Sequence, residues 1–487
     1  MLQERAPLFE ELQRYARQSL LPFHTPGHKA GRGLEIEWAV LGFPANLDLT
    51  EIPAFHWASA WEEAERLAAE FFGSDQTFFL TQGASQGIIG GISGAFSPGD
   101  TVLVGRNCHS SVIKGIILAG LNPVYIEAVF LPEFNVPIGI NVDSLKRRIE
   151  EYPWCKGLII TNPGYQGVAS RLQVFREIIG DRILFVDEAH GGHFRWMGLG
   201  GYDACDNADI WVHGTHKILG SLTQTGMLHI KKRRIDPGQV KQNLALITTT
   251  SPSYILLASL DSNRRWLALS GARIFAEKLP LIRELKNRLA KVDVLRVLTA
   301  DKLSNPDNRV VDPWKLSVHF HPVGLTGYQV ETVLREQYRI QAEYADLSQV
   351  TFLAAPWQTE GELLQLEQAL GEIAANSGRY ARARANSRAV LGVPGDFPKS
   401  IPQLIMAPRD AGLEPGQLIP LREATGRISA SIIATYPPGI PLIGPGELIR
   451  TVDIEYIQEV LACQGWVNGV DQGMVRVAKD KRKSDVI

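Results

Sequence analysis

The chain has 487 residues, of which 45% are hydrophobic and 21% are charged, and its formal net charge is −2. This length predicts two or three domains that each bury a core, and the near-neutral charge argues against nucleic acid or an anionic membrane as the main partner. We expect neither a membrane span nor a secretory signal. Four cysteines without paired spacing predict free thiols in a reducing cytoplasm: Cys108, Cys155, Cys205 and Cys463.

The first half of the chain alternates short apolar strands with helices after an N-terminal arm. Residues 1–50, rich in glycine and proline, predict an extended arm with one helix at 8–20. Strands are expected at residues 77–80, 101–104, 123–126, 157–161, 183–186, 210–212 and 227–230, and helices at 87–95, 110–118 and 142–151. This alternation predicts an α/β fold with a mostly parallel sheet covered by helices on both faces. Such sheets bind ligands at the carboxyl ends of their strands.

The second half of the chain begins with a long helical region at residues 254–290 and continues with mixed strands and helices to residue 375. A stretch with proline and glycine at 391–398 predicts a linker into a last domain. We therefore expect an arm (1–50), a large domain (51–290), a small α/β domain (291–390) and a C-terminal domain (391–487).

A small-residue turn, Leu-Thr-Gln-Gly-Ala-Ser-Gln-Gly at residues 80–87, follows the strand at 77–80 and opens a helix. Small residues let backbone N–H groups approach an anion, and a helix N-terminus favours negative charge. The hydroxyl of Ser85 adds a donor. The turn therefore predicts a phosphate site, with a plain strand–helix turn as the alternative.

Two further polar residues follow predicted strands. His109 lies just beyond the strand at 101–104, where an imidazole can stack on a flat heteroaromatic ring; a purely structural histidine is the alternative. Asp187 directly follows the apolar strand at 183–186, and a buried carboxylate is costly unless it is paired. A protonated pyridine nitrogen is one such partner, and a helix N-cap or an arginine is another.

Lys217 ends a Gly-Thr-His turn after the strand at 210–212. A lysine and an aspartate just past the ends of buried strands are what pyridoxal phosphate (PLP) chemistry requires, because the lysine holds the aldehyde as a Schiff base and the aspartate keeps the ring nitrogen protonated. Thr215 and His216 are candidates to bind the phosphate or to assist proton transfer.

A metal site is the competing interpretation of the same region. His190, His193, His213 and His216 form two H-x-x-H pairs, and Asp187 or Glu188 would complete a ligand set for a metal-dependent hydrolase. Spacing within glycine-rich loops constrains ligands less than helical spacing, and this interpretation gives Lys217 no role. A catalytically inactive protein on the same fold is a further alternative.

Seven stretches, in order along nearly the whole chain, resemble the Orn/Lys/Arg decarboxylases. These are residues 23–29 (FHTPGHK), 48–51 (DLTE), 107–111 (NCHSS), 187–190 (DEAH), 215–217 (THK), 250–254 (TSPSY) and 426–441, which holds GRISA and YPPGIP. The resemblance implies a PLP-dependent enzyme of the aspartate-aminotransferase fold (fold type I), with smaller α+β domains at its C-terminal end. The chain is similar to the short, biosynthetic-type members.

The resemblance also implies roles for matching residues. Lys217 would carry the Schiff base, Asp187 would pair with the ring nitrogen and His109 would stack on the ring. The remaining cofactor-binding residues would be Ala84, Ser85 and His216 at the phosphate and His190 near the phenolic oxygen of the ring. Residues 250–254 would lie near an active site formed at the interface of a homodimer or higher homo-oligomer.

Three residues depart from the family pattern. Many relatives have a serine at the position of Gly214, whose hydroxyl contacts phosphate, and Thr215 is the candidate to replace that contact. Gly164 stands where a hydroxyl residue or asparagine is common, and Ser431 stands where an acidic residue is usual. We expect these departures to bear on substrate identity.

We expect α-decarboxylation of a basic amino acid to an amine of polyamine biosynthesis, with arginine slightly preferred over lysine and ornithine. Lys217 or His216 would return a proton to the α-carbon. The alternative is an aminotransferase or another lyase of the same fold. Three acids are candidates to bind the distal cation of the substrate: Asp48, Glu51 and Glu343.

Overall fold

A computed structural model describes residues 2–18, 24–26, 28–35, 42, 44–49, 52–198, 201–303, 308–382, 397–436 and 439–479. The chain divides into two compact units, unit 1 with Met1–Ala95 and Ile183–Ala276 and unit 2 with Phe96–Arg182 and Glu277–Ile487. Most of the predicted linker at 391–398 lies outside the described residues, and so does Glu51. No described helix has the length and apolarity needed to cross a membrane. The four-domain division stays a prediction.

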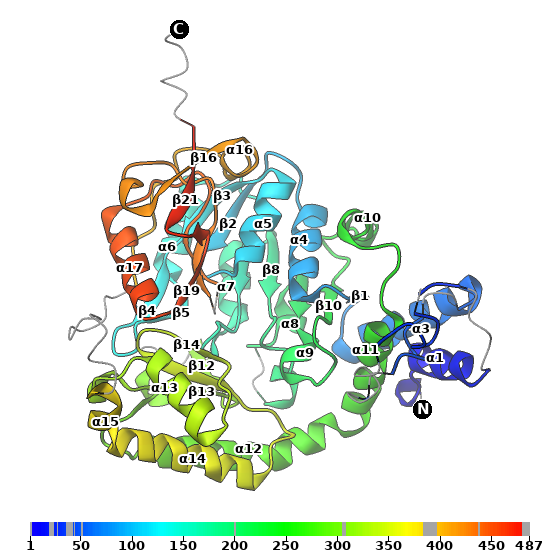
Figure 1. The fold of residues 1–487 in the computed structure, drawn as a ribbon. Coiled ribbons are helices and arrows are strands. Elements are labelled where there is room, and N and C mark those ends of the chain that lie inside the picture. The colour runs from blue at the N-terminus through cyan, green and yellow to red at the C-terminus, as the bar shows by residue number, and fades with distance from the viewer. Residues whose placement is uncertain are drawn as a thin grey trace. The chain divides into compact units, whose positions relative to one another are not determined.

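Unit 1 contains four strands in the order β1 (Gln76–Leu80), β10 (Gly226–Ile230), β9 (Ile210–His213) and β8 (Ile183–Asp187). The strands β8 and β9 run parallel, as the strand–helix alternation predicts, whereas β10 is antiparallel to both of its neighbours. The connection between β9 and β10 contains one helix of four residues, Thr215–Ile218. Figure 1 shows these strands in green and blue beside α4.

The helices of unit 1 include one pair, α4 and α10, that packs closely through glycine. The helices are α1 (Pro7–Arg17), α3 (Ala54–Phe72), α4 (Gly83–Ala95), α8 (Ala204–Asn207), α9 (Thr215–Ile218), α10 (Pro237–Ile247) and α11 (Tyr254–Trp266). A Cβ at Gly94 of α4 would lie 2.6 Å from the Cα of Val240 of α10, so only glycine allows these helices to approach this closely. The predicted helix at 254–290 is α11, a π-helical segment (Leu267–Gly271) and α12 (Ala272–Leu289), within which the division of the units falls.

Unit 2 begins with three parallel strands, β6 (Gly157–Thr161), β2 (Thr101–Gly105) and β3 (Asn122–Ile126). Their helices are α5 (Ser110–Ala119), α6 (Val142–Glu151) and α7 (Leu172–Ile179). With β1, β8, β9 and β10, they confirm all seven predicted strands. The sequence reading missed the hairpin of β4 (Ala128–Leu131) and β5 (Val136–Ile140) and the pair β7 (Val168–Ser170) and β12 (Arg309–Val311).

An antiparallel sheet follows in unit 2, in the order β11 (Arg296–Val297), β13 (Lys315–His319), β15 (Gln349–Leu353) and β14 (Tyr344–Ala345). Its helices are α13 (Gly327–Val333), α14 (Glu360–Ala375) and α15 (Ser377–Arg382). Capping boxes start α13 at Thr326 and α14 at Thr359, where each hydroxyl accepts a hydrogen bond from the third helical N–H.

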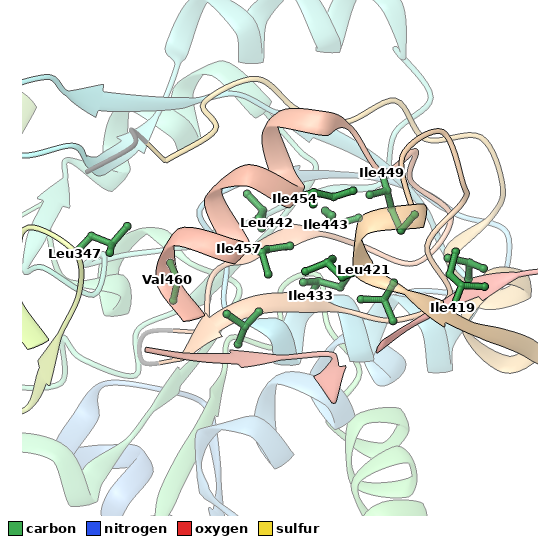
Figure 2. Close-up of a cluster of buried hydrophobic side chains, with 14 residues drawn as sticks. Leu347, Ile419, Leu421, Ile433, Leu442, Ile443, Ile449, Ile454, Ile457 and Val460 are labelled. Carbon is green, nitrogen blue, oxygen red and sulfur yellow. The ribbon is translucent and has the colours of Figure 1, made fainter. Parts of the chain in front are cut away.

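The C-terminal part of unit 2 holds two small sheets around one hydrophobic cluster. The strands are β16 (Gly416–Pro420), β21 (Met474–Ala478) and β20 (Val470–Asp471), and β18 (Pro441–Ile443), β17 (Ile433–Tyr436) and β19 (Trp466–Asn468). The helices are α16 (Pro408–Leu413) and α17 (Thr451–Ala462). Figure 2 shows Ile454 and Ile457 of α17 and Ile433 of β17 within this cluster.

Candidate active site

The parallel strands β8 and β9 carry the predicted catalytic residues of unit 1. Asp187 pairs in register with Val212, so the ends of the two strands lie at the same edge of the sheet. Asp187 is the last residue of β8 and is 2% exposed, and Lys217 lies on the short helix α9 after β9. The backbone N–H of Lys217 donates to the carbonyl of Gly214, which closes the turn that presents the lysine.

The amine of Lys217 contacts an imidazole from the neighbouring strand end. The Nζ of Lys217 lies 2.7 Å from Nε2 of His190, three residues after Asp187. His190 is 5% exposed. The structure therefore brings Lys217 and His190 into hydrogen-bond contact. The phenolic-oxygen role of His190 stays a prediction.

The carboxyl group of Asp187 is oriented by its own strand end. Its Oδ1 accepts a hydrogen bond of 3.1 Å from the N–H of Ala189. A short side-chain-to-backbone bond of this kind satisfies one oxygen and fixes the rotamer. Asp187 is thus a buried, preoriented carboxyl group at the edge where Lys217 is presented.

The predicted phosphate turn opens α4, which begins at Gly83 rather than at residue 87. Gly83 has a φ of +73°, a left-handed conformation that glycine adopts without steric cost. A residue that the sequence reading missed holds the turn, because Oε1 of Gln86 accepts from the N–H groups of Thr81 (3.2 Å) and Gln82 (3.1 Å). A glutamine shortly after a strand–helix turn is the only signal for it in the sequence.

The same turn lies beside the end of β9. A Cβ at Gly226 of β10 would stand 3.2 Å from the N of Ala84 and 2.8 Å from the carbonyl oxygen of His213. Only glycine at residue 226 lets this turn and the end of β9 both lie so close to β10. Ala84 is buried and Ser85 is half-buried. The turn and Lys217 therefore belong to one region of unit 1.

The structure gives a physical reason for glycine at position 214. A Cβ there would lie 2.8 Å from the carbonyl oxygen of Ala189 and 3.2 Å from Cδ of Lys217. A serine at this position would not fit without a shift of the backbone. The neighbouring hydroxyl of Thr215 is fully buried and donates to the hydroxyl of Thr225 (3.3 Å). The phosphate role of Thr215 stays a prediction.

His216 contacts the same residue. Its Nδ1 lies 2.7 Å from the carbonyl oxygen of Thr225, so Nδ1 carries the proton and donates it. The other ring nitrogen, Nε2, is then unprotonated in the neutral ring and can accept a hydrogen bond or a proton.

The four histidines of the metal interpretation have different neighbours. His190 contacts Lys217, whereas Nε2 of His213 lies 2.8 Å from Glu188 and Nδ1 lies 3.1 Å from His229. Within the described part of the chain, no group of three or more His, Cys, Asp or Glu side chains has the arrangement of a metal site. The geometry thus gives Lys217 a contact and offers the metal interpretation no ligand set.

His109 belongs to unit 2, where it is the N-cap residue of α5. Its Nδ1 accepts from the N–H of Ser111 (3.2 Å) and lies 2.8 Å from the hydroxyl of that serine. The structural alternative for His109 is thus met by a cap. The predicted stacking on the cofactor stays a prediction.

A buried ion pair anchors the loop that precedes His109, and the sequence reading missed it. The two terminal nitrogens of Arg106 donate to the two carboxylate oxygens of Glu447, at 2.6 and 2.8 Å, and one also donates to the carbonyl of Leu442. The side chain of Glu447 is fully buried. Nothing in the sequence around Arg106, which precedes the Asn-Cys-His motif, indicates that its partner lies 341 residues away.

The same loop meets the C-terminal Tyr-Pro-Pro-Gly-Ile-Pro motif. The N–H of Ser110 donates to the carbonyl of Gly439 (3.2 Å), and a Cβ at Gly439 would lie 3.3 Å from Nε2 of His109. Two motifs that the sequence reading treated separately thus pack together within unit 2. Asn107 of this loop is one of the residues that line a cavity of about 290 Å³ in unit 2.

The candidate distal acids and the remaining departures lie as follows. Asp48 contacts Nε2 of His28 at 3.1 Å, and Glu343 accepts from the hydroxyl of Tyr165 at 3.0 Å. A Cβ at Gly164 would meet only ordinary contacts, the nearest at 3.7 Å, so glycine there is not a steric requirement. The N–H of Ser431 donates to the hydroxyl of Ser429.

Residues 250–254 lead into α11, and the ring of Tyr254 stacks on Trp57 with centroids 3.8 Å apart. Their predicted position at a subunit interface stays a prediction.

Comparison with known proteins supports the resemblance along the whole chain. Residues 6–362 match the family "Orn/Lys/Arg decarboxylase, major domain", and residues 397–481 match "Orn/Lys/Arg decarboxylase, C-terminal domain". The chain is 35% identical to the arginine decarboxylase of Bacillus subtilis over 99% of both chains. It is also 35% identical to the arginine decarboxylase of Bacillus anthracis over 94% of both chains.

Solved structures show the same fold. The lysine decarboxylase of Francisella novicida superposes with a TM-score of 0.79 at 20% identity, over 97% of this chain and 81% of that one. The constitutive lysine decarboxylase of E. coli gives 0.78 at 19% identity, over 98% and 82%. An alanine–glyoxylate aminotransferase from Nostoc gives 0.50 at 16% identity, over 65% and 87%. The predicted aspartate-aminotransferase-like fold is confirmed. The chain belongs to the Orn/Lys/Arg decarboxylase family and is an amino-acid decarboxylase, a carboxy-lyase.

Proposed function

We propose that this enzyme removes the α-carboxylate of arginine with PLP as cofactor, and that lysine and ornithine are poorer substrates. The observation that carries the proposal is identity of 34–35% to four proteins named arginine decarboxylase, over 92–99% of the chain. A protein named lysine decarboxylase from Pseudomonas aeruginosa is 25% identical over 91% of the chain. The gap in identity favours arginine.

The residues of unit 1 fit PLP by their chemistry. The cofactor needs a primary amine for its aldehyde, an acid for its ring nitrogen and backbone donors for its phosphate. Lys217 would supply the amine, Asp187 would supply the acid, and the turn at Ala84 and Ser85 would supply the donors. The close packing at Gly226 supports this assignment, because both the turn at Ala84 and the end of β9, which precedes Lys217, lie against that glycine.

Bound PLP would supply an electron sink for the charge left on the α-carbon when carbon dioxide departs. Asp187, held by the N–H of Ala189, would keep the proton on the ring nitrogen and so maintain that sink. His109 would stack on the ring. Its cap contact with Ser111 would keep the imidazole plane fixed.

Proton transfer would use the two basic groups on α9. Lys217 would hold the cofactor through its amine and would be placed to return a proton to the α-carbon. Its contact with His190 supports this role, because an imidazole 2.7 Å away can exchange protons with the amine and replace the one that Lys217 gives. His216, with Nε2 unprotonated in its neutral form, would be the second candidate.

The distal cation of arginine requires an acid, and Glu343 and Asp48 are the described candidates. We further propose a homodimer in the cytoplasm, with a product amine that enters polyamine synthesis. The aminotransferase-like fold supports the homodimer by analogy, because enzymes of this fold form their sites between subunits.

The test is carbon dioxide release from the holoenzyme with arginine, lysine and ornithine, each assayed separately. We expect release from all three to be measurable and the highest kcat/KM with arginine. Amino transfer to an oxo acid without release of carbon dioxide would contradict the proposal. So would a purified protein that carries zinc and lacks the visible absorbance of lysine-bound PLP.

A further inference from the structure

A continuous chain of hydrogen-bonding side chains crosses the interior of unit 1. Glu188 Oε2 lies 2.8 Å from His213 Nε2, and His213 Nδ1 lies 3.1 Å from His229 Nε2. The chain continues from His229 Nδ1 to the hydroxyl of Thr77 (2.8 Å) and from there to the hydroxyl of Ser74 (2.9 Å). Four links thus join a strand end to the loop before β1.

The two ends of this chain differ in exposure. Glu188, His213, His229 and Thr77 are all at most 3% exposed, whereas Ser74 is half-buried and reaches solvent. Glu188 directly follows Asp187. The chain therefore connects solvent with the carboxyl group next to the residue assigned to the ring nitrogen.

Aromatic neighbours hold both imidazoles in place. The ring of Trp211 stacks on His229 with centroids 5.1 Å apart, and the ring of Phe72 lies 5.1 Å from His213 and 5.0 Å from His229. Because the rings are packed on several sides, their nitrogens keep these partners, and only the hydrogens remain to be placed.

The hydrogens can be arranged in only two consistent ways while both imidazoles are neutral. A neutral imidazole has one N–H and one acceptor nitrogen, so each ring passes on the direction of the bond that it receives. If Glu188 is ionised, every bond points towards it and both rings carry their proton on Nε2. If Glu188 is protonated, every bond points away from it and both rings carry their proton on Nδ1.

The surroundings favour the protonated acid. Burial, with Asp203 and Asp187 nearby, raises the pKa of Glu188 well above its usual value. Burial lowers the pKa of His213 to about 3, helped by Arg195 and His193, and it lowers the pKa of His229 well below its usual value. Both rings are thus neutral. The N–H of Ala204 donates a hydrogen bond to Oε1 of Glu188, and a protonated carboxyl group can still accept it there.

We propose that Ser74, Thr77, His229 and His213 form a proton wire that connects Glu188, as a protonated acid, with solvent. Glu188 then acts as a positioning residue, because it ties the ends of β8 and β9 together without adding negative charge next to Asp187. The effect on Asp187 rests on the proposed function, whereas the wire itself does not. The proton moves by transfer along existing hydrogen bonds, each donor receiving one proton as it gives one.

The first experiment compares the apoprotein with Glu188→Gln by infrared spectroscopy. A glutamine can accept from the N–H of Ala204 as Glu188 does, and its amide then donates to Nε2 of His213. We expect a protonated-carboxyl band in the wild type that is lost in Glu188→Gln and kept in the control Asp206→Asn, which changes an exposed neighbour.

Nitrogen NMR of ¹⁵N-histidine apoprotein gives the matching readout. We expect Nδ1–H tautomers for His213 and His229 in the wild type and in Glu188→Gln alike. Nε2–H tautomers in the wild type, or the absence of the infrared band, would overturn the protonated acid.

The second experiment interrupts the wire at Thr77. Thr77→Val keeps the shape of the side chain and removes the hydroxyl, whereas Thr77→Ser keeps the hydroxyl. After a rapid jump to alkaline pH the band of Glu188 disappears as a proton passes along the chain to solvent, and the rate of this proton exchange with solvent is the readout. We expect this exchange to slow by about tenfold or more in Thr77→Val, because it then needs local opening of the core, and to be retained in Thr77→Ser. Equal exchange rates in both variants would overturn the wire.

These readouts are separate from the proposed function. Both use the apoprotein, so a wild type that shows the band and the exchange but releases no carbon dioxide would overturn only the function. A wild type that releases carbon dioxide without the band would overturn only the wire.

Discussion

The region around Lys217 in unit 1 and the loop before His109 in unit 2 are held by different means. Lys217, His190 and Asp187 come from two neighbouring strand ends, and their contacts join residues fewer than 40 positions apart. The loop at Arg106 is held by Glu447, which lies 341 positions away. The first region is built by residues close in sequence, whereas the second depends on a segment far along the chain. Substitutions in the first region should therefore lower activity, whereas substitutions in the second should lower stability.

The largest effect is expected at the centre of the first region. Lys217→Ala should lower turnover to background, because general acid–base help alone contributes about 10² to 10⁴-fold and the covalent link to the cofactor is lost as well. The protein should stay folded. The measurements are carbon dioxide release and the absorbance of lysine-bound PLP, with the exposed Lys232→Ala as control. Retention of that absorbance in Lys217→Ala would reject the assignment.

The second region should fail by instability. Arg106→Met leaves the carboxylate of Glu447 buried without its guanidinium, and breaking a buried ion pair costs about 3–5 kcal/mol. The free energy of unfolding by urea measures this loss. Arg422→Met, which breaks an exposed pair with Glu423, should cost less than about 1 kcal/mol.

A double variant sharpens this test. Arg106→Met with Glu447→Met should recover part of the stability, because no buried charge remains. A double variant as unstable as the sum of its parts would contradict the ion-pair explanation.

A smaller effect is expected where the first region departs from its relatives. Gly214→Ser places a Cβ 2.8 Å from the carbonyl of Ala189 and should cost about 1–3 kcal/mol of unfolding free energy, as overpacking does. Gly378→Ser, at a position with open space around it, is the control. Should Gly214→Ser instead tighten PLP binding without loss of stability, the missing phosphate contact would be the more important fact.

The loss of stability in acid should depend on a buried histidine close to the first region. The pKa of His213 is about 3 in the folded protein, far below the unfolded value near 6.5. Below pH 6.5 the unfolded chain binds a proton there and the folded protein does not, so unfolding free energy falls by about 1.4 kcal/mol per pH unit. His213→Gln should remove this share and flatten the acid limb between pH 6 and 4. The exposed His56→Gln should leave the slope as it is in the wild type.

Much of the first region follows from local patterns in the sequence. The apolar run Ile-Trp-Val before the turn at residues 213–216 predicts a buried strand followed by Lys217, and the run before Asp187 does the same. Parallel strands end at one edge, so proximity of these residues follows from the strand pattern alone. The start of α4 was placed four residues too late, because the side chain of Gln86 supports the first turn and leaves no periodic signal.

What the sequence determined by itself is therefore the seven strands between residues 76 and 230, the family and the residues that stand at strand ends, since these depend on short-range periodicity and turn chemistry. Only the tertiary structure decided which distant groups meet. It paired Arg106 with Glu447, set Glu188 against His213 and His229, and left no space for a side chain at Gly214. Such contacts depend on packing between segments far apart in the chain, and a buried polar group gives no sign in the sequence of the partner that satisfies it.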